Sequence, residues 1–204
     1  MTTNEATKGP RRRIAPTLNR WAGACAAVLG LATGCGGGGP LGNPPNITNE
    51  ASEGGQKLSF AYFQRCINPI FLELLPIVGT QATNTCAGSG CHDNANGTGG
   101  AFRVIPSAAS QPVPTTPAAA DAVRSTDMYK NFYSAQGEVV MNNVSQSRLI
   151  TKPRVQGVLH GGGLIFESDS DPHVVLMRYW MSHPAPAGQD EFSTDPGNGT
   201  CSTQ

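Results

Sequence analysis

The segment from Cys86 to Gly100 constrains the fold most strongly, because it is rich in Gly, Asn, Ser and Thr yet carries two cysteines and a histidine. Its composition predicts a loop wrapped around something rather than a helix or strand. The whole chain has 25 Gly and 16 Pro among 204 residues, and only 14% of its side chains are charged. These features predict a fold rich in loops. A short domain of this kind often needs a covalent staple or a cofactor.

The start of the chain has the layout of an export signal. Residues 1–20 are polar and basic, and an apolar run without charge follows from Trp21 to Leu31. This run is too short to span a bilayer. It ends in Leu31-Ala32-Thr33-Gly34-Cys35, which resembles the bacterial lipobox. The resemblance implies a signal peptide over residues 1–34 and a diacylglycerol on Cys35; because Ala32 stands where the family prefers Leu, cleavage without lipidation is the alternative.

The mature chain carries a modest negative charge. From Cys35 onward there are nine basic and thirteen acidic side chains, a net charge of −4. No basic face remains for nucleic acid, so we expect no nucleic-acid partner. Residues 35–56 are rich in Gly and Pro and predict a flexible tether. We expect one folded domain over residues 57–187 and a tail over 188–204.

Apolar periodicity predicts mainly helices in this domain. Helical spacing of apolar residues begins after Ser59 and extends to about residue 76. A second helix is expected from Ser125 to Gly137, after an exposed Pro- and Ala-rich loop over residues 106–120. A third opens at Asp171-Pro172, an N-cap followed by proline, and runs to Pro184. With no repeat and no convincing strands, the sequence predicts a mainly α-helical fold with long loops.

The motif that carries chemistry is Cys86-Ala87-Gly88-Ser89-Gly90-Cys91-His92. Two cysteines followed at once by a histidine are typical of c-type haem attachment. The thiols add across the two vinyl groups, and the imidazole becomes the proximal ligand of the iron. Four residues separate the cysteines here instead of the usual two. The intervening Gly and Ser residues can form a loop that bulges outward while both sulfurs reach their vinyl groups.

Four segments in order resemble the class I-like cytochrome c domains of bacterial lipoproteins. They are Thr85 to Val104, Ser147 to Pro153, Leu159 to Gly162, and Tyr179 to Met181. In that family the order is the haem motif, a Ser-x-Leu segment, a loop with the distal ligand, and a closing helix with Trp. The resemblance covers about residues 57–187 and implies a small cytochrome c-like helical domain that binds one covalent haem c.

The resemblance places the distal iron ligand at His160, where the family has Met or, in one variant group, His. The other candidates are Met141, Met177, Met181, His173 and His183. For methionines at helical spacing, packing in the core is the more ordinary role. An iron bound by His92 and His160 would have no open position and a comparatively low potential. Since no nucleophile triad, paired acids or phosphate loop is present, we expect electron transfer and no enzymatic turnover.

The remaining cysteines of the mature chain are Cys66 and Cys201. In an oxidising periplasm we expect them to form a disulfide that pins the tail to the first helix, although four cysteines allow three pairings. The expected protein is a lipid-anchored cytochrome on the periplasmic side that serves redox partner proteins. Gly36 and Gly37 give no signal for inner-membrane retention, so the outer membrane is favoured.

Two other functions remain open at this point. The first is a haem-free structural or ligand-binding lipoprotein in which all four cysteines form two disulfides. The second is a zinc site built from Cys86, Cys91 and His92 with a further ligand such as His160. Both predict a colourless protein, and only the second would release one zinc per chain on acidification.

Overall fold

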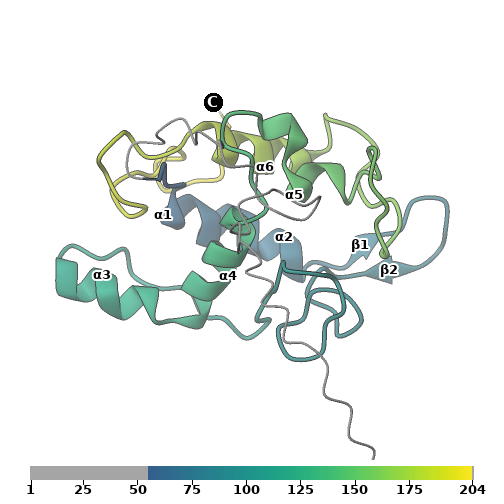
Figure 1. Ribbon diagram of the computed structural model, residues 1–204, viewed down its shortest axis with the longest axis horizontal. Coiled ribbons are helices and arrows are strands. Elements are labelled where there is room, and N and C mark those ends of the chain that lie inside the picture. The colour runs from purple at the N-terminus through teal and green to yellow at the C-terminus, as the bar shows by residue number, and fades with distance from the viewer. Residues whose placement is uncertain (1–54, 204) are drawn as a thin grey trace, which may run out of the picture. The chain divides into compact units, whose positions relative to one another are not determined.

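The computed structural model describes residues 55–203 (Figure 1). The expected signal peptide, the lipidation site Cys35 and nearly all of the tether lie outside these residues. Within the described part, no helix is both long and apolar enough to cross a membrane.

The first helical segment runs from Phe60 to Leu72 in three parts. These are α1 (Phe60–Tyr62), a wider π-helical turn η1 (Phe63–Ile67) and α2 (Asn68–Leu72). The side chain of Ser59 caps its start by accepting from the backbone N–H of Tyr62. Pro69 lacks the N–H that a regular helix needs, and a π-bulge is one way to absorb such a defect. The helix ends at Leu72, four residues before the expected end, because Glu73 is extended.

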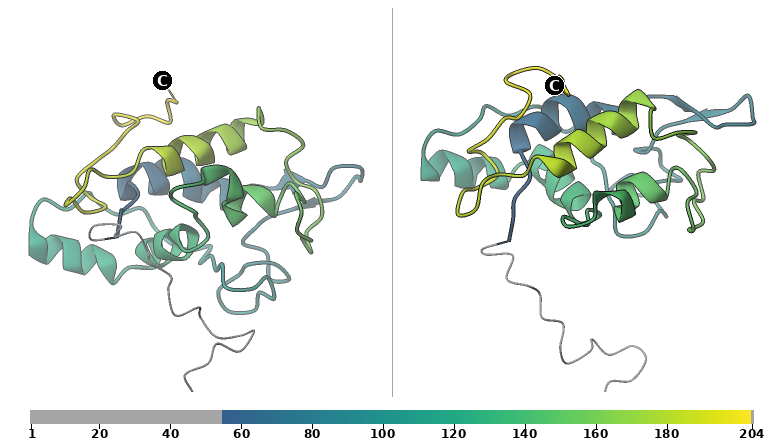
Figure 2. Two further views of the ribbon diagram at one scale, coloured as in Figure 1. Left: turned by 45° about the horizontal axis from the view of Figure 1, so that its top comes forward. Right: turned by 90° about the horizontal axis from the view of Figure 1, so that it is seen from above.

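Helices α4 (Asp127–Gln136) and α6 (Pro172–Ser182) pack against this segment. Both views in Figure 2 show α6 alongside α1 and α2. Asp171 caps α6 and Pro172 is its first residue, while Gly137 ends α4. The indole of Trp180 is fully buried and donates to the carbonyl of Ser59. A core of aromatic and aliphatic side chains therefore joins the three helices.

The loops contain more regular structure than the sequence predicts. Helix α3 (Pro117–Arg124) begins inside the expected loop 106–120, because Thr116 caps it and proline occupies its first position. Strands β1 (Leu75–Pro76) and β2 (Thr83–Asn84) form an antiparallel hairpin with Leu75 opposite Asn84. A 3₁₀ turn η2 (Val144–Gln146) leads into the short helix α5 (Arg148–Thr151). The loop that follows the hairpin and the loop that follows α5 both line one cavity.

The segment after Pro184 is bound to the first helix. Cys66 and Cys201 form a disulfide. Arg65 pairs with Asp195 at 2.7 Å, and the backbone N–H of Phe60 donates to the carbonyl of Glu191 at 2.9 Å. The expected tail is thus packed on α1 and η1 over much of its length.

Candidate functional site

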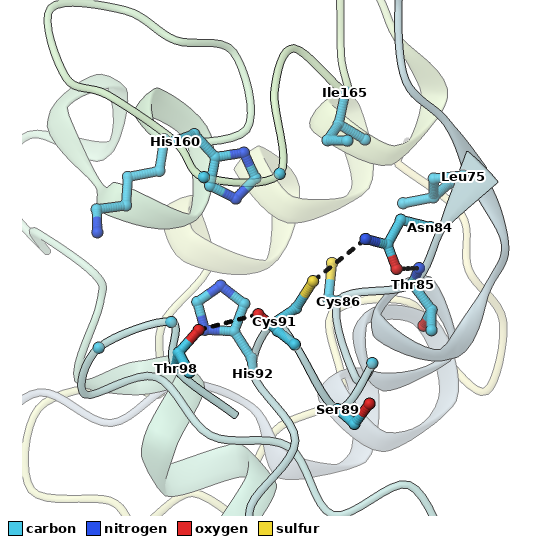
Figure 3. Close-up of a pocket in the computed structure, with 17 residues that line it drawn as sticks. Leu75, Asn84, Thr85, Cys86, Ser89, Cys91, His92, Thr98, His160 and Ile165 are labelled. Atoms are coloured by element: carbon cyan, nitrogen blue, oxygen red, sulfur yellow. Dashed lines mark hydrogen bonds between the residues drawn. The ribbon is translucent and has the colours of Figure 1, made fainter. Parts of the chain in front are cut away.

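A cavity of about 690 Å³ lies between the hairpin, the loop that follows it and the loop around residue 160 (Figure 3). A smaller cavity of about 100 Å³ adjoins it and shares several of its walls. Cofactor sites in proteins typically measure about 300–1,000 Å³. The side chains that line the larger cavity include Cys86, Cys91, His92, Lys152, His160 and Ile165. All four residues predicted for the haem site therefore meet in one place.

The cysteine motif is a compact turn fastened to the end of α2. Thr85 Oγ1 and the N–H of Ala87 both donate to the carbonyl of Phe71, at 2.8 and 3.0 Å. Within the turn, the N–H of His92 donates to the carbonyl of Cys86 at 2.9 Å. This bond brings the two ends of the motif together. In Figure 3 the sulfurs of Cys86 and Cys91 both lie at the cavity.

Neither cysteine of the motif is in a disulfide. Asn84 Nδ2 lies 3.3 Å from the sulfur of Cys91, in donor geometry. Burial, followed by the effect of the neighbouring Cys91, raises the pKa of Cys86 to about 11. The Cys86 sulfur is therefore a neutral thiol near pH 7, and thiolate ligation of a metal would require its deprotonation first.

His92 is fixed by the loop that follows it. Its Nδ1 lies 3.1 Å from the carbonyl oxygen of Phe102. That oxygen can only accept, so Nδ1 carries the proton and Nε2 keeps its lone pair for a ligand. Gly99 packs directly on the ring, because a Cβ there would lie 2.6 Å from two ring atoms of His92. The N–H of Val104 donates to the carbonyl of His92 and holds the end of this loop against the histidine.

His160 is held by a tight turn of its own loop. Its Nδ1 lies 2.8 Å from the carbonyl oxygen of Gly163, so by the same reasoning Nε2 is free to bind a ligand. Gly163 has a φ of +78°, in the left-handed region that favours glycine, and a Cβ there would lie 3.0 Å from Ile77 Cγ2. The N–H of Ile165 donates to the carbonyl of Pro153 and closes the base of the loop.

The two imidazoles face each other across the cavity (Figure 3). Their ring centres are 6.4 Å apart, and the ring planes differ by 14°. A metal–imidazole bond is about 2.0 Å long, and a nitrogen lies roughly 1.1 Å from the centre of a ring built from bonds of about 1.33 Å. One metal ion bound by both Nε2 atoms would place the ring centres about 6 Å apart. The observed spacing fits an iron between two histidines.

Burial lowers the pKa of His92, and the charges of His160, Lys152 and Arg103 lower it further against the hydrogen bond to Phe102. The lowered pKa favours the neutral imidazole, which is the form that binds a metal.

None of the other candidate ligands lines the larger cavity. His173 lies between Asp171 and Glu73, at 3.0 and 3.1 Å, and His183 is exposed and stacks on Tyr179. Met181 is buried in the core, as the helical spacing predicts. Met177 is also a core residue, but it forms part of the wall of the smaller cavity.

Sequence reasoning missed three contributors to the site. Lys152 lines both cavities, and Asn84 contacts the Cys91 sulfur. The packing of Gly99 on the His92 ring was also not foreseen. Lys152 lies in the Ser147–Pro153 segment and Gly99 in the Thr85–Val104 segment of the family resemblance, and this was the signal available for both.

Comparisons of the chain with protein-family models, curated proteins and solved structures find no match. In the described part of the chain, no group of three or more His, Cys, Asp or Glu side chains is arranged to hold a metal ion. The chemistry of the site must therefore be inferred from its own geometry.

Proposed function

We propose that the protein is an electron carrier that binds one haem c covalently through Cys86 and Cys91, with His92 and His160 as the two axial ligands. The observation that carries this proposal is the pair of parallel imidazoles, each with its Nδ1 bonded to a backbone carbonyl and its Nε2 free, at 6.4 Å. Two unpaired cysteines beside one of them, at the same cavity, add the attachment chemistry.

Each residue has a distinct role in this proposal. The thiols of Cys86 and Cys91 anchor the macrocycle, and the carbonyl of Phe102 orients His92. The turn at Gly163 orients His160 in the same way. A haem iron with two histidine ligands exchanges single electrons and has no vacant position. The redox partners, the lipid anchor at Cys35, the cell-envelope location and the cytochrome c-like fold class belong to the same proposal.

The ligand set is tested with the full chain, exported in a host that has c-type maturation machinery. His160→Met should change the reduced absorption spectrum and raise the midpoint potential, because a methionine ligand raises the potential of haem iron. His183→Met is the matched control, since His183 is exposed and bonds only to its own helix end. An unchanged spectrum and potential in His160→Met would remove His160 from the iron, and a colourless wild type would remove haem altogether.

A further inference from the structure

The cavities carry cationic side chains that have no acidic partner. Lys152 lines both cavities and Arg148 lines the smaller one. Neither forms an ion pair with any residue that the structure describes. Among the residues that the structure describes, no carboxylate lines the larger cavity, and Glu138 is the one acid at the smaller. The positive charge of the cavity walls therefore favours an anionic ligand.

Arg103 adds a buried donor next to the same site. It follows Phe102, whose carbonyl holds His92, and its backbone N–H donates to Ser134. One terminal nitrogen of its guanidinium, Nη1, is buried without a hydrogen-bond partner. A buried donor left unpaired costs about 1–3 kcal/mol, and more when it is charged. Such a group calls for a missing acceptor.

The other arginines with a buried unpaired nitrogen differ from Arg103 because each has a carboxylate partner. Arg65, Arg154 and Arg178 also have a buried unpaired nitrogen, but each already has a carboxylate partner through another nitrogen. Arg124 is paired as well. Among the described arginines, those without a carboxylate partner are Arg103, whose charge acts on His92, and Arg148, which lines the smaller cavity.

We propose that Lys152, assisted by Arg103 and Arg148, binds the acidic substituents of the macrocycle. The inference rests on the proposed function, because haem carries two propionate carboxylates. Apart from Lys152 and the haem-site residues, the larger cavity is lined by uncharged groups. These are glycines, the apolar side chains of Leu75 and Ile165, and the polar side chains of Asn84, Thr85, Ser89 and Thr98. A carboxylate buried there would have no lysine or arginine partner, and its desolvation would be costly. The acidic substituents of a bound macrocycle would therefore lie toward Lys152.

The test compares haemin with haemin dimethyl ester, which lacks free carboxylates. Both are titrated into the full chain carrying Cys86→Ser and Cys91→Ser, so that binding is non-covalent. Lys152→Gln should weaken haemin binding about tenfold, the loss expected for one charge-assisted hydrogen bond. The same change should leave the ester's affinity unaltered, and Lys152→Arg should restore haemin affinity. Lys130→Gln is the matched control, because Lys130 pairs with Asp127 on α4.

Equal losses for haemin and its ester would mean that Lys152 acts only on the structure, and no loss for either would mean that it does not bind the ligand. Both results overturn the inference. Neither result bears on covalent attachment, which is measured separately on the matured wild type. If haemin binding depends on Lys152 but the matured chain gains no thioether links, the proposed cytochrome function is wrong and the anion-binding role of Lys152 stands. A chain that binds no haemin and attaches none overturns both.

Discussion

At the scale of single residues, the site depends on backbone carbonyls that orient two imidazoles. Phe102 holds His92 and Gly163 holds His160, so neither ring depends on a carboxylate partner. Gly99 is the most constrained glycine at the site, because a Cβ there would overlap the His92 ring and the carbonyl of Cys91. Position 99 therefore has room for glycine but not for a larger residue while His92 keeps this orientation.

Gly99→Ala should lower the free energy of unfolding by about 1–3 kcal/mol, the usual cost of overpacking. Gly90→Ala is the control, because a Cβ at Gly90 meets nothing within 4 Å. Both substitutions reduce the entropy of the unfolded chain equally, so the difference between them isolates the overlap with the His92 ring and the Cys91 carbonyl. Urea unfolding of the two variants measures it. Equal stabilities would show that the loop yields to the new methyl group at no cost.

The residues of the candidate site could be named from the sequence because the motif is local. Cys86, Cys91 and His92 are neighbours in the chain, and His160 followed from the family resemblance. The structure brings these four residues to one cavity. Lys152 and Gly99 could not be assigned, because their roles depend on how distant loops fold over the cavity. No spacing rule connects a glycine to the histidine ring that it touches.

Among the helices and strands, those bounded by recognisable capping residues were predicted best. Asp171-Pro172 marked the start of α6, and Gly137 marked the end of α4. The first helix ends early at Leu72, and the hairpin was missed because its strands are only two residues long. Such short strands are set by tertiary contacts and leave no alternating pattern. Helix α3 was missed because the Pro-, Ala- and Ser-rich sequence that leads into it shows no apolar periodicity, although Thr116-Pro117 is itself an N-cap followed by proline.

Helices α3 and α4 are linked to the C-terminal segment through Glu191. This side chain is 2% exposed and accepts from Arg124 Nε at 2.9 Å and from the Tyr129 hydroxyl at 2.7 Å. Burial by itself raises the pKa of Glu191, but these hydrogen bonds outweigh burial and hold the pKa below its ordinary value of 4.5. The ionised carboxylate therefore stabilises the fold.

Glu191→Gln should lower the free energy of unfolding at pH 7 by about 1.5–3 kcal/mol, the range for hydrogen bonds to a charged group. Because the folded pKa is lowered, this contribution is full above pH 4.5 and is lost as the pH falls below it. The difference between wild type and variant should shrink accordingly in urea unfolding at pH 7, 5 and 3.5. Glu167→Gln, at an exposed position, is the control. A difference that does not change with pH would contradict the assigned charge.

Over the whole of residues 55–203, a small loop-rich fold is held together by a core of aromatic side chains and, within this range, by one long-range covalent link. The disulfide joins Cys66 on the buried first helix to Cys201 near the end of the chain, 135 residues away. A cross-link over so long a loop removes much of the entropy of the unfolded chain. The C-terminal segment in turn covers α1 and η1.

Replacing Cys66 and Cys201 together by Ala should lower the free energy of unfolding by about 2–5 kcal/mol. Dithiothreitol should destabilise the wild type by a similar amount and leave the double variant unchanged, which separates the loss of the link from the loss of packing. Urea unfolding with and without the reductant gives both numbers. A wild type indifferent to the reductant would contradict a stabilising disulfide.

Covalent attachment of haem is tested by a haem-stained denaturing gel of the matured full chain, together with a pyridine haemochrome spectrum. Wild type should keep its haem after denaturation and give the spectrum of two saturated vinyl groups, whereas Cys91→Ser should show one thioether link. Cys66→Ala with Cys201→Ala should still stain. A colourless wild-type band, with Cys86 and Cys91 joined in a disulfide, would contradict covalent haem attachment and support the haem-free lipoprotein.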